Sequence, residues 1–96
     1  MNRRVIAFDV DGTLITFDDI PRYNTIHIYK YFQSIGCEMI IWSGGGIDYA
    51  THWADKLGLY PDKVIEKGSI VPDIAFDDED VDLGKVNIKV KITLTD

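Results

Sequence analysis

The sequence predicts an α/β fold with a mainly parallel sheet, on two observations. Short apolar runs of the kind that form buried strands alternate with segments of helical periodicity. The three strongest runs each end in a residue able to do chemistry, and ligands of parallel sheets bind beyond the carboxyl ends of the strands. The 96 residues and their 46% apolar content fit one small domain, residues 1–96.

The first part of the pattern is a strand, a loop and a helix. Residues 4–9 are predicted to form a buried strand, and residues 12–20 a polar loop that contains glycine. A helix is then expected from Pro21 to about Ile35, because proline suits the first helical turn and Gly36 can end a helix. Its apolar positions include Ile28, Phe32 and Ile35.

The second part repeats this alternation. The continuous apolar run at residues 37–42 predicts a central parallel strand. Residues 47–57 place their apolar side chains on one helical face, and Gly58 follows as the helix end. Residues 64–65 are expected to form a very short strand, and residues 73–77 a further strand that ends in acids.

The tail from Lys85 to Thr95 alternates apolar and polar residues, which predicts a half-buried strand. Only about six residues separate it from Asp78, too few for a helical crossover. We therefore expect this strand to run antiparallel to its predecessor, or to leave the domain. Two arrangements stay open for it: association with a second copy of the chain, or an intramolecular hairpin.

Two aspartates stand one residue apart where the first strand ends. Asp9 and Asp11 precede Gly12, which lets the backbone turn, and the hydroxyl residue Thr13. Carboxylates this close repel each other, so the pair needs a cation or a raised pKa. Mg²⁺ is the expected cation because it prefers oxygen ligands. A plain acidic turn is the other interpretation; an EF-hand is disfavoured, since the twelfth position from Asp9 is Ile20.

The run from Phe8 to Leu14 resembles the DxDGT signature of the haloacid dehalogenase (HAD) superfamily of phosphotransferases. Three further sites match the other motifs of that superfamily in order, over residues 4–82. The resemblance implies a three-layer, Rossmann-like core and a Mg²⁺-dependent phosphomonoester hydrolase that works through an aspartyl-phosphate. The interval between motifs one and two and the interval between motifs two and three each have room for only one helix here, so we expect no cap domain.

The resemblance also assigns the chemistry of the first motif. Asp9 matches the nucleophile, and Asp11 matches the general acid/base, which protonates the leaving oxygen and later activates water. An acid at the position of Asp11 favours phosphatase chemistry over the ATPase branch of the superfamily. Gly12 and Thr13 are expected to contact the phosphate.

The second and third motifs are expected to bind phosphate. Ser43 matches the hydroxyl of motif two, and the glycines that begin at Gly44 let backbone N–H groups approach the anion at a helix N-terminus. A plain N-cap serine is the alternative interpretation. Motif three is a lysine. Lys63 and Lys67 both qualify, and Lys67 is preferred because it lies close to motif four, ten residues before Asp77.

The fourth motif matches the acidic run from Asp77 to Asp82. The resemblance makes Asp78 a direct Mg²⁺ ligand, together with Asp9 and the backbone carbonyl of Asp11. Asp77 is expected to support the site without binding the metal directly, and Asp82 to act through water. A solvated acidic turn is the alternative interpretation.

Composition bears on partners and compartment. The net charge of −6 does not indicate a nucleic-acid surface, which is usually basic. The single cysteine, Cys37, is interpreted as a buried, inert thiol, and the lack of an internal disulfide fits a reducing cytoplasm. No signal peptide and no membrane-length apolar segment is visible, so we expect no membrane partner.

An open site without a cap suits a phosphorylated macromolecule, or a small phosphorylated substrate covered by another subunit. A second class of function stays open: a catalytically weak HAD-like domain that binds phosphate or another protein. The small size of the chain, the glycine-rich second motif and the aromatic residues of the first helix favour this second class. Turnover of a generic aryl phosphate with Mg²⁺ separates the two classes.

Overall fold

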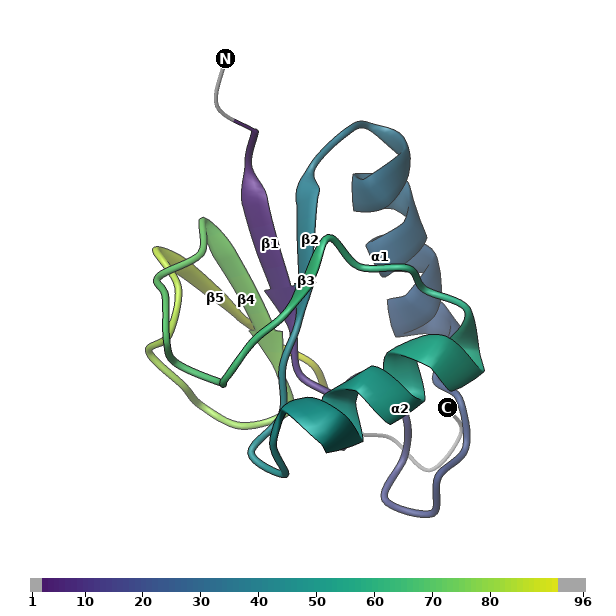
Figure 1. The fold of residues 1–96 in the computed structure, drawn as a ribbon. Coiled ribbons are helices and arrows are strands. Elements are labelled where there is room, and N and C mark those ends of the chain that lie inside the picture. The colour runs from purple at the N-terminus through teal and green to yellow at the C-terminus, as the bar shows by residue number, and fades with distance from the viewer. Residues whose placement is uncertain (1–2, 92–96) are drawn as a thin grey trace.

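The chain forms five short strands and two helices in a computed structural model that describes residues 3–91 (Figure 1). In chain order these are β1 (Val5–Phe8), α1 (Tyr23–Ser34), β2 (Glu38–Ile41), α2 (Ile47–Leu57), β3 (Lys63–Val64), β4 (Ile74–Asp77) and β5 (Val86–Lys89). The strands lie close to the predicted positions, because β1, β2 and β4 are short apolar runs and β5 alternates apolar and polar residues.

All the strands join one sheet in which each neighbouring pair is parallel. Their spatial order is β3-β2-β1-β4-β5. The chain therefore builds outward from β1 to β3 and then returns across the sheet to β4, on the other side of β1. The direction of winding reverses between β1 and β4, and the crevice beyond the carboxyl ends of two such strands is where parallel sheets bind ligands.

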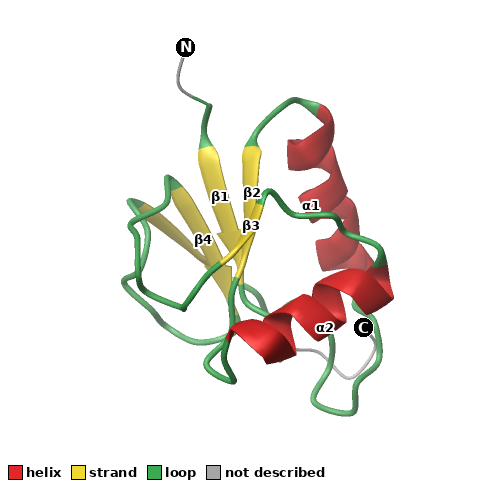
Figure 2. Ribbon diagram, in the orientation of Figure 1, coloured by secondary structure: helices red, strands yellow, loops and turns green. Residues whose placement is uncertain are grey.

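Both helices pack on the same face of the sheet (Figure 2). Ile6 and Phe8 of β1 share one buried cluster with Tyr29 of α1 and Trp53 of α2. The Tyr29 ring meets Phe8 edge-on with a centroid distance of 5.2 Å, and its hydroxyl donates to the carbonyl of Leu59 at 3.1 Å. This cluster fixes both helices relative to β1, the strand that carries the first motif.

The opposite face carries loops in place of helices. A second buried cluster lies there: Ala7, Ile40, Trp42 and Ala75. Ile65 and Leu83, from the connections that follow β3 and β4, pack against it. The predicted three layers are therefore present, but the third layer consists of loops and not of helices. These connections, residues 65–73 and 78–85, are too short to hold a helix of average length.

The prediction that the last strand runs antiparallel is wrong. β5 pairs in parallel with β4, from Ile74 opposite Val86 to Asp77 opposite Lys89. Strands of four residues are only about 13 Å long, so an extended return over residues 78–85 reaches from one end of the sheet to the other without a helix. The predicted strand also continued to Thr95, and its residues from 92 onward lie outside the described part of the chain.

Two residues make this short return fit. Gly84 passes so close to β4 that an added Cβ would lie 2.9 Å from the backbone nitrogen of Ala75. The Asn87 side chain accepts hydrogen bonds from the N–H groups of Leu83 and Gly84, each at 2.9 Å, and donates to the Gly84 carbonyl at 2.8 Å. The close approach and the side-chain cap take the place of the crossover helix that usually connects parallel strands.

The first helix differs from its prediction in its start and in its buried face. α1 begins at Tyr23, and Pro21 belongs to the preceding loop, where it forms an antiparallel bridge with Ile15. Ile28 and Ile35, two of the apolar positions named for this helix, are 44% and 57% exposed. The buried positions are Thr25, Ile26 and Tyr29. Apolar and aromatic residues surround this helix, so its periodicity did not decide which face packs on the sheet.

The second helix has the predicted bounds, Ile47–Leu57, and Gly58 follows it in the left-handed conformation with φ +65°. Cys37 is buried, as predicted.

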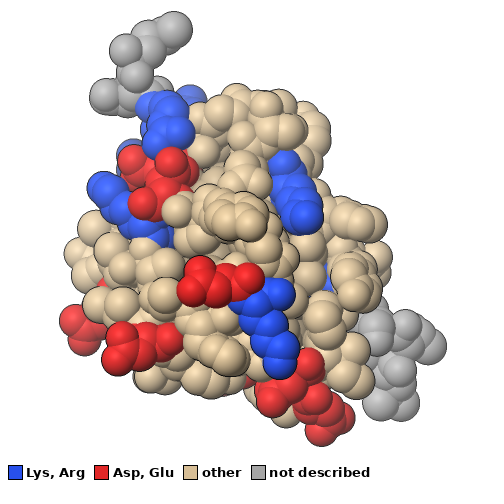
Figure 3. Space-filling model, turned by 45° about the vertical axis from the view of Figure 1, so that its right-hand side comes forward, with Lys and Arg blue, Asp and Glu red and all other residues tan. Residues whose placement is uncertain are grey.

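Within residues 3–91 the longest connection, residues 9–22, is far smaller than a cap domain. Neither helix of this region is long and apolar enough to cross a membrane. On the face shown in Figure 3, several acidic and basic side chains lie next to one another in small mixed groups, and uncharged surface lies between the groups.

Candidate active site

Asp9 and Asp77 meet at the carboxyl edge of the sheet, where the winding reverses. Asp9 follows β1 directly, and Asp77 is the last residue of β4. Their predecessors, Phe8 and Phe76, are register partners with rings stacked at 4.4 Å, and the Asp9 N–H donates to the Phe76 carbonyl at 3.0 Å. Both aspartates are buried, at 5% and 1% exposure. Strand pairing therefore forces two acids side by side in the interior.

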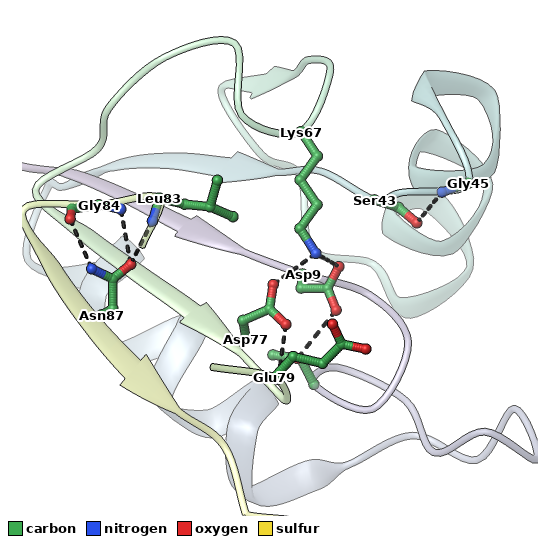
Figure 4. Close-up of polar contacts among 10 residues, drawn as sticks. Asp9, Ser43, Gly45, Lys67, Asp77, Glu79, Leu83, Gly84 and Asn87 are labelled. Atoms are coloured by element: carbon green, nitrogen blue, oxygen red, sulfur yellow. Dashed lines mark hydrogen bonds and ion pairs between the residues drawn. The ribbon is translucent and has the colours of Figure 1, made fainter. Parts of the chain in front are cut away.

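Lys67 bridges these two carboxylates. Its Nζ lies 3.1 Å from Asp9 Oδ1 and 2.7 Å from Asp77 Oδ2 (Figure 4). The lysine comes from the connection that crosses the sheet from β3 to β4. Lys63, the other candidate, lies on β3 and pairs with Glu38 at 3.9 Å. The structure brings Lys67 to the acids and leaves Lys63 elsewhere.

The charges of this cluster are not balanced. Burial raises the pKa of Asp9 to about 7; the negative charge of Asp77 adds to the rise, and Lys67 opposes it. Burial also raises the pKa of Asp78. Burial alone would lower the pKa of Lys67, but its contacts with Asp77 and Asp9 outweigh burial and raise it. One lysine facing three acids leaves an excess of negative charge that favours a further cation.

The third carboxylate, Asp78, reaches the turn that follows Asp9. A Cβ on Gly12 would overlap the Asp78 carboxylate, and Gly12 has φ +77°. Only glycine meets both requirements without strain. Carboxylate oxygens of Asp9, Asp77 and Asp78 all lie within 4.8 Å of one another. Hard oxygen donors at this spacing suit Mg²⁺.

Both oxygens of Asp77 are already engaged. Oδ1 accepts the N–H of Glu79 at 3.0 Å, and Oδ2 contacts Lys67 at 2.7 Å (Figure 4). Asp78 is only partly buried, against the near-complete burial of Asp77. The geometry thus suits Asp77 to holding the lysine and the loop, and leaves Asp78 better placed to bind a metal.

Asp11 lies at the mouth of the site, half-buried. Its Oδ1 accepts a hydrogen bond from the hydroxyl of Tyr49 at 2.7 Å. This hydrogen bond is the main reason that the pKa of Tyr49 is raised, so the tyrosine stays protonated and remains a donor. Tyr49 was not among the residues predicted for the site; the available signal was its position in the first turn of the helix that follows Ser43.

Ser43 is buried just beyond the end of β2, beside β1. Its Oγ accepts the N–H of Gly45 at 3.0 Å, which folds the glycine loop over the serine (Figure 4). The hydroxyl keeps its own hydrogen available for an anion. Gly46, with φ +102°, directly precedes α2, and a helix N-terminus attracts negative charge.

These side chains surround one hollow of about 320 Å³. It is lined by Asp9, Asp11, Phe17, Ser43, Gly44, Gly45, Lys67, Asp77, Asp78 and Glu79. Thr13 lies beneath the surface, with Oγ1 3.5 Å from Asp9 Oδ2, a weak contact. Asp82 is exposed and does not line the hollow, whereas Phe17 and Glu79, which the sequence analysis did not select, do.

Arg22 holds the loop that carries the first motif. This buried side chain donates to the carbonyl of Gly12 at 2.7 Å and to the carbonyl of Lys91 at 2.8 Å. It ties the turn after Asp9 to the segment that follows β5. The sequence offered no signal for this role, because both of these acceptors are backbone carbonyls.

A larger hollow, of about 660 Å³, lies at the opposite, amino end of the sheet. Its charged groups form ion pairs: Arg4 contacts Asp73 at 3.7 Å, and Lys85 contacts the same carboxylate oxygen at 3.5 Å. Parallel sheets bind ligands at their carboxyl ends. The smaller hollow is therefore the candidate active site.

Known proteins resemble this chain over most of its length. The family model described as haloacid dehalogenase-like hydrolase matches residues 6–86. An uncharacterised 36.0 kDa protein of Orgyia pseudotsugata multicapsid polyhedrosis virus is 33% identical over 74 residues, which cover 72% of this chain and 24% of that protein. An uncharacterised 38.0 kDa protein of Autographa californica nuclear polyhedrosis virus is 33% identical over 72 residues, which cover 70% of this chain and 22% of that protein.

The chain thus spans about a quarter of the length of these two viral relatives. No solved structure matches it. The matched residues include the end of β1, the glycine loop, Lys67 and the acidic end of β4, which together form the hollow.

Proposed function

Because the chain belongs to the haloacid dehalogenase-like hydrolases, we propose that it is a Mg²⁺-dependent phosphomonoester hydrolase that works through an aspartyl-phosphate on Asp9. One observation carries the proposal: Lys67 contacts Asp9 at a point where three carboxylates converge. A carboxylate is a weak nucleophile, and it attacks phosphorus effectively only where it is fixed in position and the phosphate charge is neutralised.

The oxygen donors at the site fit Mg²⁺. We assign the ion to Asp9, the backbone carbonyl of Asp11 and Asp78, with Asp77 holding Lys67 in place. When bound, Mg²⁺ would lower the repulsion between the Asp9 carboxylate and the incoming phosphate. The excess negative charge of the acid cluster supports this assignment.

Asp9 and Asp11 divide the first step between them. An oxygen of the Asp9 carboxylate forms a bond to phosphorus while the bond from phosphorus to the leaving oxygen breaks. Asp11, in its protonated form, gives its proton to that oxygen, so the product leaves as a neutral alcohol. The phosphoryl group then remains on Asp9 as an acyl phosphate.

The second step releases phosphate. Water attacks the phosphorus of the acyl phosphate, and the carboxylate of Asp11 takes a proton from that water. The bond between phosphorus and the Asp9 oxygen breaks, so Asp9 returns as a carboxylate and Asp11 as an acid. Lys67, the Ser43 hydroxyl and the Gly44 N–H are assigned to the phosphoryl oxygens in both steps.

The substrate is proposed as a phosphomonoester, either a small molecule or a group on a macromolecule. The hollow opens to solvent with no cap over it in the described residues, and Phe17, 66% exposed, stands at its rim. Water exclusion therefore has to come from the substrate or from a partner.

Turnover of 4-nitrophenyl phosphate with Mg²⁺ tests the proposal. Asp9→Asn should lower kcat at least about a thousandfold, because it removes the nucleophile. Asp82→Asn is the matched control: it removes the same charge from an exposed position outside the hollow and should keep the wild-type rate. An Asp9→Asn variant that retains most of the activity refutes the assignment.

The assignment of the metal ligands is tested separately, by the melting temperatures of the wild type and of two variants. Mg²⁺ should raise the melting temperature of the wild type, because it binds the folded site alone. Asp78→Ala should lose this response, whereas Asp82→Asn should keep it. An unchanged response in Asp78→Ala contradicts the ligand set.

A second candidate is a HAD-like domain that binds phosphate or another protein with little or no turnover. Exposed aromatic side chains favour it, since Phe17, Tyr23 and Tyr31 are 66%, 65% and 60% exposed. A wild-type chain that binds phosphate in the hollow yet matches the rate of its Asp9→Asn variant supports this candidate.

A further inference from the structure

One hydrogen bond at the site joins two elements that are distant in the sequence, and neither step of the proposed reaction uses its donor. The hydroxyl of Tyr49 donates to Oδ1 of Asp11 at 2.7 Å, across 38 residues of chain. Asp11 belongs to the loop after β1, and Tyr49 belongs to the first turn of α2. The contact links the helix that follows Ser43 to the carboxyl group assigned to proton transfer.

Packing fixes the position of Tyr49. The next residue, Ala50, and Trp53 one turn later are buried in the core between the helices and the sheet, so α2 cannot rotate about its axis. On its other side the ring lies against the glycine loop, where a Cβ on Gly45 would come within 3.1 Å of the ring. Glycine at this position lets the ring pass, and the half-buried tyrosine arrives at Asp11 from a rigid support.

The backbone at Asp11 is held by a bridge to Ile15, but within the described part of the chain Tyr49 is the only hydrogen-bond partner of the Asp11 carboxyl group. It is half-buried and stands at the start of the loop of residues 11–22, whose tip at residues 17–20 is exposed. A general acid acts only within hydrogen-bond reach of the leaving oxygen, about 2.6–3.2 Å. A donor that holds Oδ1 leaves Oδ2 as the oxygen that carries and receives the proton.

We propose that Tyr49 is the positioning residue for Asp11, holding one carboxyl oxygen so that the other faces the leaving group. The inference rests on the proposed function and deepens it. Tyr49 touches neither the phosphate nor the reacting oxygen, so it acts through Asp11 and through nothing else at the site.

The proposal predicts a dependence on the leaving group. 4-Nitrophenolate is a stable anion and leaves without a proton, whereas the alkoxide of an alkyl phosphate needs the acid. Loss of Tyr49 should therefore lower kcat/KM for ethyl phosphate much more than for 4-nitrophenyl phosphate. This parameter is suited to the test because it covers the steps up to the first irreversible one, the transfer to Asp9.

The experiment compares Tyr49→Phe with the wild type on both esters. We expect a fall of about tenfold or more for ethyl phosphate and of less than about twofold for 4-nitrophenyl phosphate. Tyr60→Phe, at a position 83% exposed, is the matched control and should change neither value. Both esters are assayed on the same preparation, so any loss of folded protein cancels from their ratio.

A double-mutant cycle excludes a purely structural role. In an Asp11→Asn background, which has no acid to position, Tyr49→Phe should cause no further fall on ethyl phosphate. Equal falls on both esters, or full additivity with Asp11→Asn, overturn the inference while leaving the proposed function intact. A wild type with no turnover that Asp9→Asn abolishes overturns the proposed function, and the inference falls with it.

Discussion

At the scale of single residues, the fold places Asp9 where its ionised form is disfavoured. Asp9 and Asp77 are buried because they directly continue buried strands, and they are adjacent because β1 and β4 pair. Lys67 compensates only part of the charge, and the pKa of Asp9 rises to about 7. A carboxyl group with a strongly shifted pKa in a hollow is typical of functional sites. A bound cation would offset the repulsion between these carboxylates.

The raised pKa of Asp9 predicts how metal-free stability varies with pH. The unfolded chain loses this proton near pH 3.8, whereas the folded chain keeps it to about pH 7. Stability should therefore fall as pH rises between these values, relative to Asp9→Asn, which does not titrate there. Melting temperatures of the two proteins in a chelator measure the difference, and Mg²⁺ should abolish the fall.

The comparison with Asp9→Asn is needed because other acids act in the opposite sense. Hydrogen bonds from backbone N–H groups lower the pKa of Asp62 and of Asp73, and these groups lose their stabilising effect as pH falls. Both remain in the variant and cancel from the difference. A difference that stays constant from pH 4 to pH 8 contradicts the electrostatic account of Asp9.

The acids of the site were predictable and their partners were not. Asp9 and Asp77 each end an apolar run, which is a local signal that any single sequence shows. Tyr49 donates to a carboxyl oxygen, and Arg22 donates to two backbone carbonyls. These partners are not neighbours in the sequence. No local pattern encodes such contacts. Asp82, expected to act through water, lies exposed outside the lining of the hollow, because an acidic run does not reveal which of its members turns toward the site.

At the scale of elements, strand positions followed from the sequence, and one pairing direction did not. The alternation after Lys85 correctly indicated a strand at β5, but loop length suggested the wrong direction. Gly84 and Asn87 permit the parallel return. Helix bounds were predictable for α2, where Gly58 ends a clear apolar face, and less so for α1, whose apolar residues surround the helix.

Substitution of Gly84 tests the origin of the parallel return. A Cβ there would lie 2.9 Å from the nitrogen of Ala75 and 2.9 Å from the carbonyl oxygen of Val86, both backbone atoms. Gly84→Ala should therefore lower the free energy of unfolding by about 1–3 kcal/mol, with faster hydrogen exchange in β5. Denaturant titration measures the first effect.

Gly44→Ala is the control for this prediction. A Cβ at Gly44 meets nothing within 4 Å, and its φ is not left-handed, so the free energy of unfolding should change by less than about 0.5 kcal/mol. Equal stability of the two variants would show that the return does not depend on the close approach at Gly84.

At the scale of the whole molecule, the sheet ends at β5, an edge strand whose four residues are all exposed. Val86 and Ile88 are 53% and 41% exposed. An exposed strand edge offers backbone N–H and C=O groups for pairing. We propose that a second copy of the chain covers this edge.

Sedimentation equilibrium tests self-association through β5. The wild type should dimerise at about 100 μM, a concentration at which weak edge contacts of this kind become populated. Ile88→Lys places a charge on the edge and should shift the chain to monomer. Val71→Lys, at a position 68% exposed and outside any strand, should behave as the wild type. A wild type that remains monomeric rules the association out.

The most direct test of the central claim is a pre-steady-state burst measurement on Asp11→Asn with Mg²⁺ and an excess of 4-nitrophenyl phosphate. Loss of the base slows hydrolysis of the intermediate, while the good leaving group still departs. The account predicts a burst of about one equivalent of nitrophenolate per chain and a phosphoryl group recovered by mass spectrometry on Asp9. Steady turnover without a burst, or a phosphoryl group on any other residue, would contradict it.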